Sequence, residues 1–155
     1  MAEKEDTIVI ESGAAVQPFN YAVGMYGSKF LKELKNNRVI LGVKCPKCGK
    51  VYVPPRKVCG PCFTEMHEFV EVGPGGKIGT FTILRYAFID PETGKQKPVP
   101  YGYGFIQLDG ADTLFQHYIN IDDESKVKIG ARVEPVFSEE LKGTVRDIQY
   151  FRVVD

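Results

Sequence analysis

Residues Cys45–Cys62 read CPKCGKVYVPPRKVCGPC and place four cysteines in two CxxC pairs with ten residues between the pairs. Each CxxC turn brings two thiolates close enough to share one ion, and two such turns complete a tetrahedral set of sulfur ligands suited to zinc. Gly49, directly after the first pair, fits a tight turn, whereas Phe63 in the matching place predicts a less regular second turn. The spacing predicts a zinc site formed by Cys45, Cys48, Cys59 and Cys62.

The predicted site is structural, because four protein ligands leave no open position for water or substrate. Iron in the same cage remains an alternative that spacing does not exclude. The tetrapeptide CGPC at Cys59–Cys62 also occurs in thioredoxin-like redox sites. We favour the metal site because no βαβ pattern precedes this tetrapeptide, Pro54-Pro55 lies just upstream, and a second CxxC stands at ribbon spacing.

Upstream of the cysteines, the pattern over residues 21–36 is helical. Apolar residues recur there at spacings of three and four. Because Ser28 could cap the start of a second helix, the pattern allows either one helix or two short helices. A strand is expected over residues 38–44, a short apolar piece over residues 51–53, and a loose arm over residues 1–18 with an extended piece at Thr7–Ile10.

Downstream of Glu68, strands follow one another and are separated by turn signals such as Asp109-Gly110. Gly79 lies near the start of the first long strand, where a barrel strand can bend sharply. Five main strands in about 80 residues suit a small barrel of the OB type. We expect strands at Phe69–Val72, Lys77–Ile89, Tyr101–Leu108, Thr113–Ile121, Ala131–Phe137 and Val145–Val153.

The expected fold is therefore mainly β with an N-terminal helical segment, in which a rubredoxin-like zinc ribbon precedes a five-stranded OB-fold barrel. The expected domains are an N-terminal arm and helix (1–37), a zinc ribbon (38–67) and an OB-fold domain (68–155). The length of 155 residues and the 43% share of apolar residues suit a globular protein of this size.

Charge is distributed unevenly along a chain that is neutral as a whole. Residues 1–67 carry a balance of +4 and residues 68–155 a balance of −4, and nine basic residues between Lys29 and Lys57 face a single acid, Glu33. One explanation of these basic residues is electrostatic, because a zinc ion with four thiolates has a net charge of about −2, which nearby cations offset. The other explanation is a phosphate-binding patch, with Arg56 and Lys57 favoured because Pro54-Pro55 would hold them out from the ribbon.

No catalytic residue is predicted. Every cysteine belongs to the metal site, and Ser125 and Ser138 lack a glycine-flanked nucleophile turn. His117 shares a predicted strand face with Phe115 and Ile119, which favours a packed or interfacial imidazole over a catalytic one.

The chain is not expected to span or attach to a membrane. No run of eighteen apolar residues is present, and the acidic N-terminus has no apolar core followed by a cleavage site. A secretory signal is therefore not expected, which indicates the cytoplasm, where thiols stay reduced and paired CxxC units favour a metal over a disulfide.

The combination of CPKCG, Pro54-Pro55-Arg56, the second CxxC pair and a β-domain with YGYGFIQLDG resembles the zinc-ribbon and OB-fold proteins that accompany thiolases. The resemblance covers about residues 19–155. Members of that family are small, non-catalytic subunits bound to thiolase-fold enzymes that act on acyl-CoA, including archaeal, steroid-degrading and anaerobic-aromatic systems.

This resemblance implies a hetero-oligomer with a thiolase-fold catalytic subunit, in which the thiolase chemistry belongs to the partner and the CoA ester is shared with it. The basic region from Lys29 to Lys57 would then face the CoA phosphates. The helix, with Phe30, Leu31 and Leu34, is either the docking element for the partner or packs on the β-domain.

Nucleic-acid binding is the alternative function, since zinc ribbons and OB-folds both occur in nucleic-acid-binding proteins. Composition argues against it, because grooves that follow a phosphate backbone need surplus Lys and Arg, and the β-domain carries −4.

Overall fold

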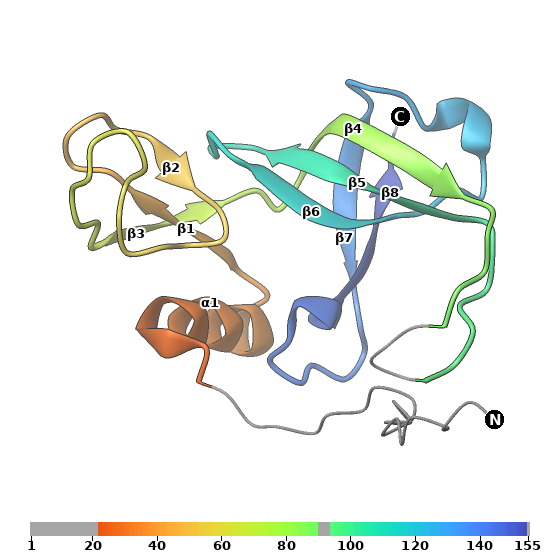
Figure 1. Ribbon diagram of the computed structural model, residues 1–155, viewed down its shortest axis with the longest axis horizontal. Coiled ribbons are helices and arrows are strands. Elements are labelled where there is room, and N and C mark those ends of the chain that lie inside the picture. Colours follow the sequence, from red (N-terminus) through yellow and green to blue (C-terminus); the bar gives the residue numbers. More distant parts are fainter. Residues whose placement is uncertain (1–21, 90–93, 155) are drawn as a thin grey trace, which may run out of the picture.

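The computed structural model describes residues 22–89 and 94–154. One helix and a three-stranded sheet lie beside a closed five-stranded barrel (Figure 1). The predicted arm with its extended piece at Thr7–Ile10, and residues 90–93 of a predicted turn, lie outside the described residues. Within those residues, every helix is too short or too polar to cross a membrane.

Helix α1 (Gly24–Asn37) is a single helix that runs through Ser28, so a second helix does not begin there. Arg38 ends it in a left-handed conformation (φ 56°), with its backbone N–H donating to the Leu34 carbonyl at 3.1 Å. Phe30 and Leu34 are buried in the main core and Leu31 packs against it, so this face is not a free docking surface. Of the two interpretations of this helix, internal packing is confirmed.

The ribbon sheet has the antiparallel order β2 (Val51–Tyr52), β1 (Ile40–Lys44) and β3 (Glu68–Val72). Strand β3, expected as the first strand after the ribbon, pairs with β1 along its whole length, from Ile40 opposite Val72 to Lys44 opposite Glu68. The sheet that carries the cysteines is therefore completed by the segment that leads into the barrel.

The barrel closes in the order β4-β5-β6-β8-β7. Its strands are β4 (Gly76–Leu84), β5 (Tyr101–Leu108), β6 (Leu114–Ile119), β7 (Arg132–Phe137) and β8 (Ile148–Val153). The predicted bend is confirmed, because the pairing of β4 with β5 shifts register between Ile78 and Thr80, on either side of Gly79. A Cβ on Gly79 would lie 3.2 Å from the Phe105 carbonyl oxygen, so the two strands approach closely at this point.

Four strands are shorter than expected. Strand β6 covers Leu114–Ile119 rather than Thr113–Ile121, and β7 begins at Arg132 rather than Ala131. Strand β4 ends at Leu84 rather than Ile89, and β8 begins at Ile148 because residues Val145–Asp147 form a 3₁₀ turn. The side chain of Asp147 explains this turn: its carboxylate accepts hydrogen bonds from the backbone N–H groups of Lys142 (2.9 Å) and Gly143 (2.8 Å). A buried acid that satisfies backbone donors favours a turn over an extended strand.

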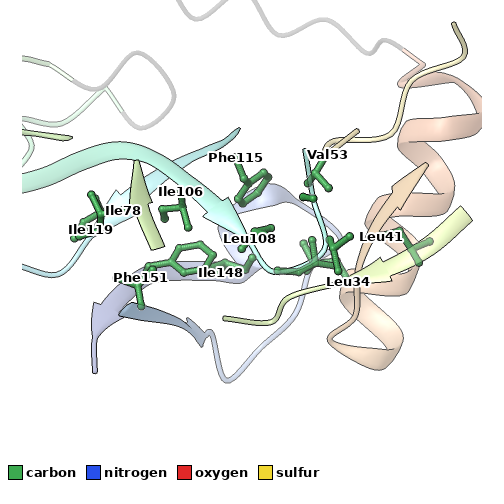
Figure 2. Close-up of a cluster of buried hydrophobic side chains, with 14 of the residues drawn as sticks. Leu34, Leu41, Val53, Ile78, Ile106, Leu108, Phe115, Ile119, Ile148 and Phe151 are labelled. Carbon is green, nitrogen blue, oxygen red and sulfur yellow. The ribbon is translucent and has the colours of Figure 1, made fainter. Parts of the chain in front are cut away.

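One hydrophobic core joins the helix, the ribbon sheet and the barrel. Figure 2 shows Leu34 of α1 and Leu41 of β1 in the same cluster as barrel residues such as Leu108. Val53 also belongs to this cluster, whereas Tyr52 belongs to a second, smaller one that surrounds the cysteines. The expected fold class, mainly β with one helix, a ribbon and a five-stranded barrel, is confirmed.

Candidate metal centre

The two CxxC segments form the same backbone turn twice. The N–H of Gly49 donates to the Cys45 carbonyl at 2.9 Å, and the N–H of Phe63 donates to the Cys59 carbonyl at 2.9 Å. Both residues have positive φ, 75° at Gly49 and 52° at Phe63. The prediction of a less regular second turn is wrong, because Phe63 adopts the left-handed conformation that a glycine takes in the first turn. Its side chain is 85% exposed.

The turns bring all four cysteines together, with their sulfur atoms within 4.8 Å of one another. Cys45 and Cys59 are buried, Cys62 is half-buried and Cys48 is exposed, and all four are free thiols. The Sγ atoms of Cys48 and Cys59 are 3.7 Å apart. A tetrahedral zinc with Zn–S bonds of about 2.3 Å requires sulfur separations of about 3.8 Å, so the spacing fits and supports a structural zinc.

The crowded thiols shift one another's pKa values, and a bound cation would be needed for all four to ionise together. The hydrogen bond from Tyr52 is the main cause that lowers the pKa of Cys59 to about 6, so this sulfur is prone to ionise. The neighbouring Cys48 is the main cause that raises the pKa of Cys62 to about 12. Four sulfurs this close cannot all carry charge without a positive ion among them, and a divalent metal supplies that ion.

Tyr52 is a member of the site that sequence reasoning missed. Its ring is buried and its hydroxyl lies 3.3 Å from the Sγ of Cys59. The signal was present in the alternation of a short strand: Val51 and Val53 point into the main core, so the residue between them points to the opposite face.

The two residues predicted to bind the CoA ester have different neighbours. The Arg56 guanidinium lies 3.9 Å from the centroid of the Tyr52 ring. Lys57 forms an ion pair of 2.8 Å with Glu65, and this partner raises the pKa of Lys57. Arg56 thus stands over the side chain that contacts a ligand sulfur, which agrees with the electrostatic explanation of the basic residues. Binding of CoA by Arg56 and Lys57 stays a prediction.

His117 is packed inside the barrel, as expected. Its ring stacks on Phe115 with centroids 5.7 Å apart, and its Nδ1 accepts a hydrogen bond of 2.9 Å from the Tyr118 backbone N–H. Nε2 lies 3.2 Å from the Val145 carbonyl oxygen and donates to it. Burial is the main cause that lowers the pKa of His117, so the imidazole is neutral and has both nitrogens engaged.

Fold and site together define a protein in which a Cys₄ zinc ribbon is joined to an OB-fold barrel. Two family models match the chain: the ChsH2 rubredoxin-like zinc ribbon domain over residues 33–67 and the ChsH2 C-terminal OB-fold domain over residues 69–138. The chain is 32% identical over 108 residues to a DUF35 domain-containing scaffold protein of Methanocaldococcus jannaschii. The aligned region covers 68% of this chain and 72% of that protein. The chain belongs to the DUF35 family of ChsH2-type proteins.

Two solved structures share the fold. One is a DUF35-family protein of unknown function from Sulfolobus solfataricus, with 25% identity, a TM-score of 0.57, and coverage of 85% of this chain and 87% of that one. The other is a chain of the Ltp2-ChsH2(DUF35) aldolase, with 17% identity, a TM-score of 0.62, and coverage of 86% and 98%.

Proposed function

We propose that this chain is a cytoplasmic, non-catalytic, zinc-binding subunit of an acyl-CoA thiolase complex, an acyltransferase. It stabilises a thiolase-fold partner in a hetero-oligomer and helps to bind the CoA ester. The observation that carries the proposal is the 32% identity to a relative named as a scaffold protein. The shared fold with the ChsH2(DUF35) chain of an aldolase adds support, because that chain occurs together with a second protein, Ltp2.

The distribution of reactive groups agrees with a supporting role. Among the described residues, the four cysteines all lie in one cluster and His117 is buried with both ring nitrogens engaged. A closed Cys₄ zinc has no free position for substrate. In this proposal, the thiolase chemistry therefore takes place on the partner.

We divide the chain, for this function, into an N-terminal arm and helix (1–37), the zinc ribbon (38–67) and the OB-fold domain (68–155). Arg56 and Lys57 on the ribbon are the proposed contacts for the CoA phosphates. The finer proposal is thiolysis of benzoylsuccinyl-CoA to benzoyl-CoA and succinyl-CoA in anaerobic aromatic degradation, based on the resemblance to the small subunit of benzoylsuccinyl-CoA thiolase.

Co-expression with a thiolase-type protein encoded beside this chain tests the proposal. We expect the two proteins to elute together in size-exclusion chromatography, and thiolysis to depend on both. Arg56→Met and Lys57→Met should raise the KM for the CoA ester, and Lys128→Met, at an exposed position outside the basic region, is the matched control. Separate elution, together with thiolysis that does not depend on this chain, would refute the proposal. Binding of single-stranded nucleic acid instead would favour the alternative function, a nucleic-acid-binding protein.

A further inference from the structure

A cavity of about 460 Å³ opens on the barrel beside β5, β6 and β8, and no ribbon residue lines it. It lies where the barrel is least tightly paired, because β6 and β8 share only the parallel pairing of Ile119 with Phe151. The side chains of Tyr101, Tyr118 and Tyr150 and the cations Lys97 and Arg146 are among its lining groups.

Two of these rings hold Lys97 in place. Its ammonium lies 3.2 Å from the centroid of the Tyr118 ring and 4.6 Å from that of Tyr101, and its side chain is half-buried. The face of an aromatic ring attracts a cation without neutralising it. Within the part of the chain described, no carboxylate forms an ion pair with Lys97. The charge is therefore positioned by the rings and available to an incoming anion.

The backbone fixes the aromatic wall. Gly102 follows Tyr101 on β5, and a Cβ there would lie 2.5 Å from the Ile119 carbonyl oxygen. Only a glycine allows β5 and β6 to approach this closely at that position. The Tyr101 and Tyr118 rings consequently meet edge to face, with centroids 5.8 Å apart and planes at 71°. A wall set by backbone contact is preorganised for a ligand.

Among the described residues that line the cavity, Asp122 is the acidic one, and its carboxylate accepts a hydrogen bond of 3.1 Å from the Asn120 amide. The ammonium of Lys97, which the rings hold in place, favours a negatively charged ligand, and the tyrosine rings favour a flat one. The volume suits a single small molecule, since ligand pockets run to about 300–1,000 Å³. We infer that this cavity binds an aromatic ring that carries an anionic group, which a mononucleotide or an aromatic carboxylate can supply.

This inference does not depend on the proposed thiolase partner, since the cavity is formed by this chain alone. Its failure would leave the proposed function standing. The test titrates the full, zinc-loaded chain with adenosine 5′-monophosphate and with benzoate, which represent the two sources. Inorganic phosphate and a short single-stranded oligonucleotide serve as comparison ligands. Calorimetry or the fluorescence of the tyrosines reports binding, because the chain has no Trp.

The informative variant is Lys97→Met, which keeps the apolar stem and removes the charge. Lys95→Met, in the same loop but outside the cavity lining, is the matched control. We expect binding of at least one ring-bearing anion with a dissociation constant below about 1 mM, weakened about tenfold or more by Lys97→Met. Lys95→Met should leave it within about twofold. Tyr118→Leu, whose melting temperature is checked first, should also weaken binding.

If adenosine 5′-monophosphate binds and benzoate does not, the ligand is of the mononucleotide class. If only benzoate binds, the ligand is an aromatic carboxylate. The inference is overturned if neither ligand binds at 10 mM, a concentration about tenfold above the expected dissociation constant. Equal affinity in Lys97→Met, or equal affinity for inorganic phosphate, overturns it as well. If the oligonucleotide binds more tightly than the mononucleotide, and this binding is lost in Lys97→Met, the cavity is a nucleic-acid site and not a site for a small molecule.

Discussion

The hydroxyl of Tyr52 lies 3.3 Å from the Sγ of Cys59, inside the small core that surrounds the cysteines. This hydrogen bond is the main cause of the lowered pKa of Cys59, and it is also the main cause of the raised pKa of Tyr52. The phenol thus donates to the sulfur and stabilises its thiolate form, which is the form that binds zinc. A ribbon residue outside the CxxC pairs therefore contributes to the metal site.

Tyr52→Phe should weaken zinc binding about tenfold, because it removes this donor and keeps the ring. The pKa of Cys59 should rise, so zinc should be released at a higher pH than from the unaltered chain. Competition with a chromogenic chelator measures both effects. Tyr26→Phe is the matched control, since the Tyr26 hydroxyl donates to the Met66 carbonyl at 2.6 Å rather than to a sulfur. Equal losses in the two variants would contradict the role of Tyr52.

Phe63→Gly should leave the ribbon as stable or more stable, although it removes a large apolar side chain. Phe63 has φ 52° and is 85% exposed, so glycine relieves backbone strain of about 1 kcal/mol and loses little packing. Gly49→Ala, at φ 75° in the first turn, should destabilise by a similar amount. Thermal melting of the zinc-loaded variants checks these signs.

An exposed, strained phenylalanine needs a reason outside the ribbon, and the proposed partner supplies one. We therefore expect Phe63→Gly to weaken association with the thiolase-type partner while the isolated chain stays folded. Val58, another exposed apolar ribbon residue, offers a comparison through Val58→Thr. If Phe63→Gly melts earlier than the unaltered chain, the strain argument is wrong, and if co-elution is unchanged, Phe63 is no partner contact.

The free energy of unfolding should fall as the pH drops below the ordinary histidine pKa of 6.5, because of His117. Burial lowers its pKa below the ordinary value of 6.5, so the unfolded chain takes up the proton first and gains stability relative to the fold. The contribution is fully present above pH 6.5 and is lost as the pH falls toward the folded pKa. His117→Gln should flatten this dependence in urea titrations, whereas an unchanged slope would show that other groups cause it.

Asp147→Ala should destabilise the barrel by about 2–3 kcal/mol, because the N–H groups of Lys142 and Gly143 lose their acceptor in a part-buried position. Asp147→Asn keeps one acceptor oxygen and should cost less. Urea denaturation at neutral pH measures both, with the exposed Glu139→Ala as the reference. A loss no larger than that of the reference would mean that the turn does not need the carboxylate.

Local patterns predicted the cysteine set and several barrel strands well. Strand β5 has the predicted ends, Tyr101 and Leu108, because glycines and turn signals mark it clearly. The pairing of β3 with β1 was not predictable, since strand pairing depends on contacts distant in sequence. The continuous helix through Ser28 likewise reflects the burial of Phe30 and Leu34, which outweighs a weak local capping signal.

The central claim, a zinc-ribbon scaffold subunit of a thiolase complex, is tested most directly by native mass spectrometry of the co-expressed proteins. We predict one assembly that contains both chains and one zinc for each copy of this chain. Removal of the metal with a strong chelator should dissociate the assembly, because the ribbon loses the ion that holds its two turns together. Separate masses for the two proteins, or an intact assembly with no zinc, would contradict the account.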